Sequence, residues 1–143
     1  MDKLILENTV LALLKAAPQT SCMRDPTRGG LATTLHEWAA AARATITIEE
    51  ETLPINQHIR AASDILGLDP LYVANEGVLV AAVPLDQVTA ALAALRGQAL
   101  GANAAIIGRV GELVKHTPLI LRTAAGGERR VDLPRGELLP RIC

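Results

Sequence analysis

The stretch "LATTLHEWAAAARATITIEE", residues 31–50, decides the fold class because its periodicity changes midway. In its first part, apolar side chains recur at intervals of three and four residues, which predicts a helix with one apolar face. Its second part, "ATITIEE", alternates β-branched and polar residues and is typical of a strand that ends before Pro54. This stretch therefore predicts a helix that leads directly into a strand. The apolar positions of the helix are Leu31, Leu35, Trp38, Ala39 and Ala42.

The flanking segments supply further helices and strands. "KLILENTVLALLKA", residues 3–16, predicts a helix that Pro18 stops, and a turn-rich segment, residues 19–30, follows it. We expect a helix in residues 55–67 with Gly67 as its C-cap. Another is expected in residues 87–97 with Asp86 as its N-cap. The helix in residues 55–67 carries Ile55, Ile59, Ala62 and Leu66 on one face, and the remaining strands are expected in residues 78–84, 102–113 and 118–123.

The order of these elements predicts an α+β domain, with helices packed on one face of a mainly antiparallel sheet. The chain has 143 residues, 50% of them hydrophobic and 20% charged, which is enough for one domain with a core. The last ten residues or so contain no periodic pattern. We expect them to form a flexible tail.

Composition also excludes several classes of function. The net charge is -1, so there is no basic field for nucleic acid or for an anionic membrane. Trp38 and Tyr72 are the only aromatic residues, which excludes platforms for base stacking. No apolar run reaches the length of a membrane span, and the first residues do not read as a secretory signal. With only Cys22 and Cys143, a disulfide framework is not expected, and the predicted compartment is the cytoplasm.

The first candidate motif is "MRDPTRGGL", residues 23–31. Asp25 can cap a helix whose first residue is Pro26, since proline is tolerated there. Gly29 and Gly30 would then leave backbone N–H groups uncovered at the start of the helix, and Arg28 would add positive charge to an anion site. The alternative is a capped helix whose glycines let another backbone approach closely. Physical reasoning alone slightly favours this alternative.

The second candidate is "YVANEGVLV", residues 72–80, in which Glu76 precedes Gly77 on a short connection into an apolar strand. A carboxylate there could be partly desolvated and act as a general base. Alternatively it is a solvated loop glutamate, which spacing alone favours.

The third candidate is the end of the chain, "LPRGELLPRIC", residues 133–143. Its prolines and glycine predict an extended strip, and about ten residues could reach on the order of 30 Å. Cys143 is either a thiol carried for chemistry or the last residue of a frayed terminus. No metal site is predicted, because the three histidines stand apart without ligand spacing. We expect His36 and His58 to lie on helix surfaces and Cys22 to be partly buried.

Three segments together resemble the C-terminal half of the HypE family of hydrogenase maturation factors, in the aminoimidazole-ribonucleotide-synthetase superfamily. They are "MRDPTRGGLATTLHE", "DPLYVANEG" and the terminal "PRIC". The resemblance covers essentially the whole chain. It implies a synthetase-like C-terminal α+β domain in residues 1–133 and a flexible tail in residues 134–143 that ends in Cys143.

The resemblance also implies an activity. Cys143 would accept a carbamoyl group from the carbamoyltransferase HypF, and ATP with Mg²⁺ would be used to dehydrate it to a thiocyanate. The cyano group would pass to an iron held by the HypC–HypD complex, as a cyanide ligand for [NiFe]-hydrogenase. Glu76 matches a carboxylate implicated in proton removal. A loop near the phosphate and dimer region is matched by Asp25, Arg28, Gly29 and Gly30.

One departure from the family pattern limits these implications. Family members have an N-terminal domain that supplies most of the ATP site and the centre of a homodimer, and that half is absent from these 143 residues. We therefore expect no ATP hydrolysis by this chain alone. Two other functions remain open: a non-catalytic module that docks to HypF or the iron scaffold, and a relative from purine or selenophosphate synthesis with a coincidental cysteine.

Overall fold

The computed structural model describes residues 2–75, 77–114, 116 and 118–133, with side chains from residue 7 onward. The chain forms two compact units. Unit 1 consists of Met1–Arg24 and Leu79–Ile106, and unit 2 consists of Asp25–Val78 and Ile107–Cys143. Within the described part of the chain, no helix has both the length and the apolar character needed to cross a membrane.

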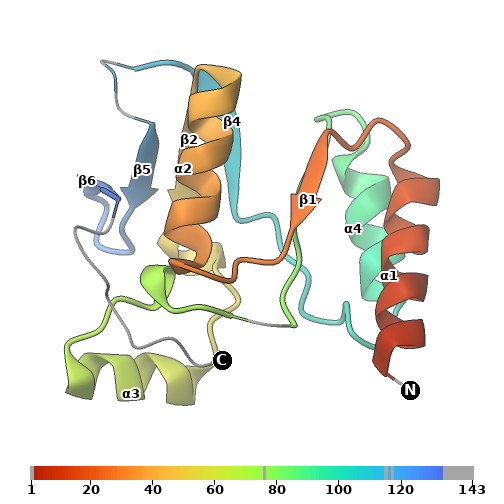
Figure 1. Ribbon diagram of the computed structural model, residues 1–143, viewed down its shortest axis with the longest axis horizontal. Helices are drawn as coiled ribbons and strands as arrows, with labels where there is room; N and C mark the ends of the chain where they lie inside the picture. Colours follow the sequence, from red (N-terminus) through yellow and green to blue (C-terminus); the bar gives the residue numbers. More distant parts are fainter. Residues whose placement is uncertain (1, 76, 115, 117, 134–143) are drawn as a thin grey trace. The chain divides into compact units, whose positions relative to one another are not determined.

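Unit 1 contains two helices and one pair of strands. Helix α1 (Asp2–Ala16) lies beside helix α4 (Val88–Arg96), as Figure 1 shows. Strands β1 (Cys22–Arg24) and β3 (Val80–Ala82) pair in antiparallel fashion. The core of this unit forms where the apolar face of α1 meets α4, since Leu13, Ala17 and Ala91 are all buried there. Leu79, Ala81, Val83 and Leu95 pack around them.

The sequence predicts three of these four elements. The helix in residues 3–16, the helix in residues 87–97 and the strand in residues 78–84 are confirmed, although the strand is short. The prediction that Asp86 caps α4 is wrong, because Gln87 holds the N-cap position. Asp86 lies instead in a turn that the bond from Gln87 N–H to Pro84 O closes. Strand β1 was not predicted, because its three residues lie in a segment rich in turn-forming residues.

Unit 2 is a four-stranded sheet with a helix on one face. Strands β4 (Gly108–Glu112), β2 (Ala44–Glu49), β5 (Leu119–Arg122) and β6 (Glu128–Arg130) lie in that order. The β2–β4 and β5–β6 pairs are antiparallel, and the β2–β5 pair is parallel. Helix α2 (Gly30–Ala42) packs on β2 and β5 (Figure 1). The predicted α+β class and the mainly antiparallel pairing are therefore confirmed.

The core of unit 2 lies between α2 and this sheet. Along β2 and β5 every second side chain points toward the helix, and these side chains are apolar in both strands. Of the strand predicted at residues 102–113, only β4 is observed. The residues before β4 form successive turns in unit 1 instead. The buried apolar side chains of α2 and the sheet are Ala32, Leu35, Ala39, Ala44, Ile46, Ile48, Leu119 and Leu121.

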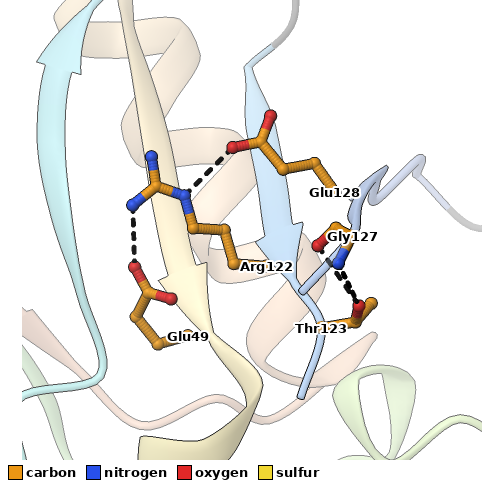
Figure 2. Close-up of polar contacts among 5 residues, drawn as sticks. All are labelled: Glu49, Arg122, Thr123, Gly127 and Glu128. Carbon is orange, nitrogen blue, oxygen red and sulfur yellow. Dashed lines mark hydrogen bonds and ion pairs between the residues drawn. The ribbon is translucent and has the colours of Figure 1, made fainter. Parts of the chain in front are cut away.

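Polar contacts bind the strands on the other face of the sheet. Figure 2 shows Arg122 between Glu49 and Glu128, with nitrogen–oxygen distances of 3.2 and 3.0 Å. These residues stand directly opposite one another on β2, β5 and β6. The β5–β6 connection is closed by paired contacts between Thr123 and Gly127 (Figure 2). Because the three charged side chains are about half exposed, we expect them to add little to stability.

Unit 2 also contains helix α3 (Gln57–Leu66) and two short 3-10 helices, η1 (Glu50–Thr52) and η2 (Pro70–Tyr72). Asn56 caps α3 by accepting a bond from His58 N–H at 2.8 Å. Gly67 ends α3 in the left-handed conformation, which confirms the predicted C-cap. On the predicted apolar face of α3, Ile59 remains 50% exposed and Leu66 68% exposed.

Candidate functional site

The first candidate motif forms a turn that leads into α2. Helix α2 begins at Gly30, and its N-cap is Gly29, so the prediction of a helix that starts at Pro26 with Asp25 as its cap is wrong. The physical reason is that both glycines adopt left-handed conformations, with φ of 74° and 63°, which forces a turn just before the helix. Gly30 N–H donates to Thr27 O at 3.0 Å within that turn.

Gly30 is where the first two motifs meet. A Cβ on Gly30 would lie 2.5 Å from the carbonyl oxygen of Leu71 and 2.7 Å from that of Val73. The same two segments are joined by a bond of 2.9 Å from Asn75 N–H to Pro26 O. The structure thus supports the interpretation that the glycine permits close backbone approach. It also brings residues 25–30 and 69–75 together within unit 2, which spacing did not predict.

The predicted anion site has fewer donors than expected. Since Gly30 N–H already bonds to Thr27 O, it is not free to bind an anion. Asp25 and Arg28 are exposed, and the positive end of the α2 dipole lies nearby. Among the described residues, one buried side-chain atom beside this turn has no hydrogen-bond partner, the Thr33 hydroxyl. Any Cβ on Gly29 would overlap that hydroxyl, so Gly29 leaves room for it.

Glu76 and Cys143 lie outside the described residues, so the roles suggested for them stay predictions. The neighbours of position 76 are described. Asn75 and Gly77 are both exposed, and Gly77 has a φ of 88° with no atom within 4 Å of the place where a Cβ would stand. Asn75, the last described residue before position 76, belongs to the segment that is bound to the Gly30 turn.

Residues 129–132 are held against the same segment. The Tyr72 hydroxyl donates to Asp132 O at 2.7 Å, and Arg129 pairs with Asp69 at 2.5 Å. His36 Nε2 hydrogen-bonds Val131 O. Tyr72 lies in η2, Asp69 caps η2, and His36 lies in α2.

Sequence reasoning missed the positions of His36 and Tyr72. The prediction that His36 lies on the helix surface is wrong, because only 8% of the residue is exposed. Helical spacing could have predicted that His36 is buried, because it lies on one helix face with Ala32, Leu35 and Ala39. His58 is exposed and Cys22 partly buried, as predicted. No pattern along the chain pointed to a partner for the Tyr72 hydroxyl.

The environment of Tyr72 shifts its ionisation. Burial raises the pKa of the Tyr72 phenol, and the nearby Asp69 carboxylate raises it further, while Arg129 opposes this change. The hydroxyl therefore keeps its proton and remains able to donate to Asp132 O. In unit 1, burial likewise raises the pKa of the Cys22 thiol, which favours the unreactive protonated form. Over the described residues, no three His, Cys, Asp or Glu side chains gather as metal ligands would.

The chain matches one protein family over most of its length. The family described as AIR synthase related protein, C-terminal domain, matches residues 1–118. A carbamoyl dehydratase HypE from Azotobacter vinelandii is 45% identical over 142 residues, which are 99% of this chain and 41% of that protein. The chain thus spans about two fifths of the length of that relative.

Solved structures agree with this match. The crystal structure of a hydrogenase maturation protein HypE in complex with ATP has a TM-score of 0.78 and 41% identity, over 87% of this chain and 38% of that one. That of a HypE–HypF complex has a TM-score of 0.83 and 33% identity, over 90% of this chain and 41% of that one.

Proposed function

This chain belongs to the family of AIR synthase related proteins, as their C-terminal domain, and from its similarity to HypE carbamoyl dehydratases we propose that it acts in making the cyanide ligand of hydrogenase iron. In this proposal the chain is the part of a dehydratase that carries the acceptor cysteine. The observation that carries it is the contact between the Gly30 turn and residues 69–75, since it joins two of the three motifs into one site.

Cys143 is the proposed acceptor. Its thiolate attacks the carbamoyl carbon of a donor, a sulfur–carbon bond forms, and the donor's leaving group departs with the electrons of the broken bond. A carbamoyltransferase of the HypF type is the proposed donor enzyme, and the structure of one relative is a HypE–HypF complex.

Dehydration of the carbamoyl group follows. Its oxygen is a poor leaving group until it takes the terminal phosphate of ATP. The carbon–oxygen bond then breaks as phosphate leaves, and the nitrogen gives up two protons to leave a carbon–nitrogen triple bond. Glu76 is the proposed base, because a carboxylate can accept the nitrogen protons as phosphate leaves. The described turn contributes the charge of Arg28 and the dipole of α2, which suit the phosphate.

In this proposal, the chain alone is not sufficient for the activity of the whole dehydratase. Because the chain spans about two fifths of its relative, we propose that the remaining part completes the site for ATP. The chain alone should then accept a carbamoyl group without turning over ATP. The HypC–HypD complex and Mg²⁺ are proposed as the later cyanide acceptor and the metal partner of ATP.

Intact mass analysis tests the acceptor role. The chain is incubated with a HypF-type carbamoyltransferase, carbamoyl phosphate and ATP, and we expect the mass of one carbamoyl group to be added. The Cys22→Ser variant should still gain this group, and the Cys143→Ser variant should not. Labelling of the Cys143→Ser variant, or no labelling of the unaltered chain, would contradict the proposal. Loss of one water from the adduct is expected only when the N-terminal part of a HypE relative is added.

A further inference from the structure

Strand β4 lies at one end of the sheet in unit 2, and no described strand pairs with its outer edge (Figure 1). The bond from Glu49 N–H to Ile107 O at 2.9 Å shows that the backbone of Ile107 faces β2. Backbone groups alternate between the two sides of a strand, so every second residue after Ile107 also faces β2. The residues between them direct their N–H and C=O groups outward, and these are Gly108, Val110 and Glu112.

The outer edge of β4 is accessible along most of its length. Arg109, Gly111 and Glu112 are exposed, and Val110 is 57% exposed. Val110 stands opposite Ile46 in the β2–β4 pair and so lies on the face of the sheet that carries α2. Helix α2 packs on β2 and β5 and leaves Val110 largely uncovered. An exposed strand edge with an apolar side chain at its centre is a template for pairing with another strand.

The sequence of β4 is complementary to itself in antiparallel pairing. With Val110 placed opposite Val110 of a second copy, two apolar side chains meet at the centre. Arg109 then stands opposite Gly111 of the second copy. Glu112 stands opposite Gly108 in the same way, so each charged side chain faces a glycine. Because Val110 directs its backbone groups outward in both copies, the central pair can exchange two hydrogen bonds.

Neighbouring registers are less favourable. A two-fold axis at Arg109 or at Glu112 would set like charges directly opposite each other, which destabilises a strand pair. An axis at Gly111 would place Val110 against Glu112, and so pair an apolar side chain with a carboxylate. The axis at Val110 instead brings Leu113, which is 46% exposed, opposite an isoleucine of the second copy. Charge and apolar contact therefore favour the same register.

We propose that a second copy of this chain pairs with β4 in antiparallel fashion, about a two-fold axis at Val110, and that the two four-stranded sheets thereby become one continuous sheet. The inference is independent of the proposed function, because no residue of β4 belongs to the candidate site. Five residues of strand span about 17 Å, so the seam is small beside a standard interface, which buries about 800 Å² on each partner. We therefore expect a reversible dimer whose population rises with protein concentration.

Disulfide formation between two different variants tests the register. In the proposed pair, Arg109 of one copy and Gly111 of the other form a non-hydrogen-bonded pair with Cα atoms about 4.5 Å apart, within the range that a disulfide spans. Two copies of position 109, or two of position 111, lie about 8 Å apart, which is too far. Both sites suit the test, since Arg109 is exposed and no atom lies within 4 Å of a Cβ on Gly111.

The two variants, Arg109→Cys and Gly111→Cys, are made separately in a chain that also carries Cys22→Ser and Cys143→Ser, so each chain has one thiol. Under mild oxidation we expect the mixture of the two variants to form a disulfide-linked heterodimer, identified by its mass, and each variant alone to remain largely monomeric. Equal linking in all three samples, or stronger linking in one variant alone than in the mixture, would overturn the inference.

Sedimentation velocity over a range of protein concentrations tests the pairing without a cross-link. Val110→Lys sets two ammonium groups opposite each other at the axis, so it should leave only monomer where the unaltered chain is a dimer. The matched control is Ile65→Lys, because Ile65 is 85% exposed and lies on α3. Survival of the dimer in Val110→Lys, its equal loss in Ile65→Lys, or an unaltered chain that is monomeric at every concentration would each refute the interface. Fluorescence of Trp38 confirms that each variant is folded before it is compared.

Discussion

Replacing Gly30 with alanine tests the contact on which the candidate site depends. Gly30 has a φ of 63°, and a Cβ there would lie within 2.5–2.8 Å of the backbone of residues 71–73. Those neighbours are backbone atoms, which cannot rotate aside as a side chain can. The variant must therefore either move η2 away from α2 or change the start of the helix.

The magnitude can be worked out from two separate costs. A left-handed conformation costs an ordinary residue roughly 1–2 kcal/mol. Forcing extra volume into a packed contact costs about 1–3 kcal/mol more. The chain offers a matched control in Gly67, which has nearly the same φ of 65° but no atom within 4 Å of its Cβ position. We expect Gly30→Ala to lower the free energy of unfolding by about 2–5 kcal/mol and Gly67→Ala by only about 1–2 kcal/mol.

Urea unfolding followed by Trp38 fluorescence measures both variants, because Trp38 is the only tryptophan and lies on α2. The difference between the two losses gives the cost of the close approach alone. If Gly30→Ala cost no more than Gly67→Ala, the close contact between the Gly30 turn and η2 would be refuted, and with it the joining of the two motifs.

Two further predictions use other parts of the chain. Tyr72 is the only tyrosine, so its ultraviolet titration should give a midpoint above 10 in the native protein and about 10 in denaturant. Since the native state binds the phenol proton more tightly than the unfolded state does, the Tyr72 phenol contributes fully to the free energy of unfolding below pH 10. This contribution is lost as pH rises through the raised pKa of Tyr72. Tyr72→Phe should abolish this pH-dependent loss. Identical midpoints in both states would contradict the described environment. In unit 1, Leu13→Ala should cost about 2–5 kcal/mol because Leu13 is fully buried, whereas Leu11→Ala, at a residue 56% exposed, should cost about 0.5 kcal/mol or less. Equal costs in denaturant unfolding would show that α1 does not pack on α4 through Leu13.

Periodicity predicted most of the fold because it reports which residues face a core. The predicted helix at residues 3–16, the α2–β2 stretch and the strand at residues 118–123 follow from local pattern and are all observed. Strand β1 escaped prediction because three residues are too few to show alternation and owe their conformation to pairing with β3. The start of α2 was misplaced because Asp25 and Pro26 resemble a cap and first turn, whereas Gly29 and Gly30 adopt left-handed conformations that are costly for most other residues.

The candidate site was predicted as separate motifs and not as an arrangement. Spacing singled out the turn at Gly29 and Gly30, but it could not show that Leu71 and Val73 lie against Gly30, since that contact joins residues some forty positions apart. The same reason hid the bond from Tyr72 to Asp132, which spans sixty positions. His36 is a different case, because helical spacing already placed it on the buried face and only its polar character argued otherwise.

Unit 1 is built from two stretches that are far apart in the sequence, and this separation affects how the chain folds while it is synthesised. Residues 25–78, most of unit 2, are translated between its two parts. At about 5–20 residues per second, the roughly 80 residues from Ala17 to the end of α4 take about 4–16 s to appear. During that interval the apolar stripe around Leu13 has no α4 to cover it. The nascent chain would therefore expose an apolar helix face at the ribosome exit tunnel and to chaperones that bind unfolded chains. Slowing translation between the two parts of unit 1 should increase the fraction of chains that is lost to aggregation.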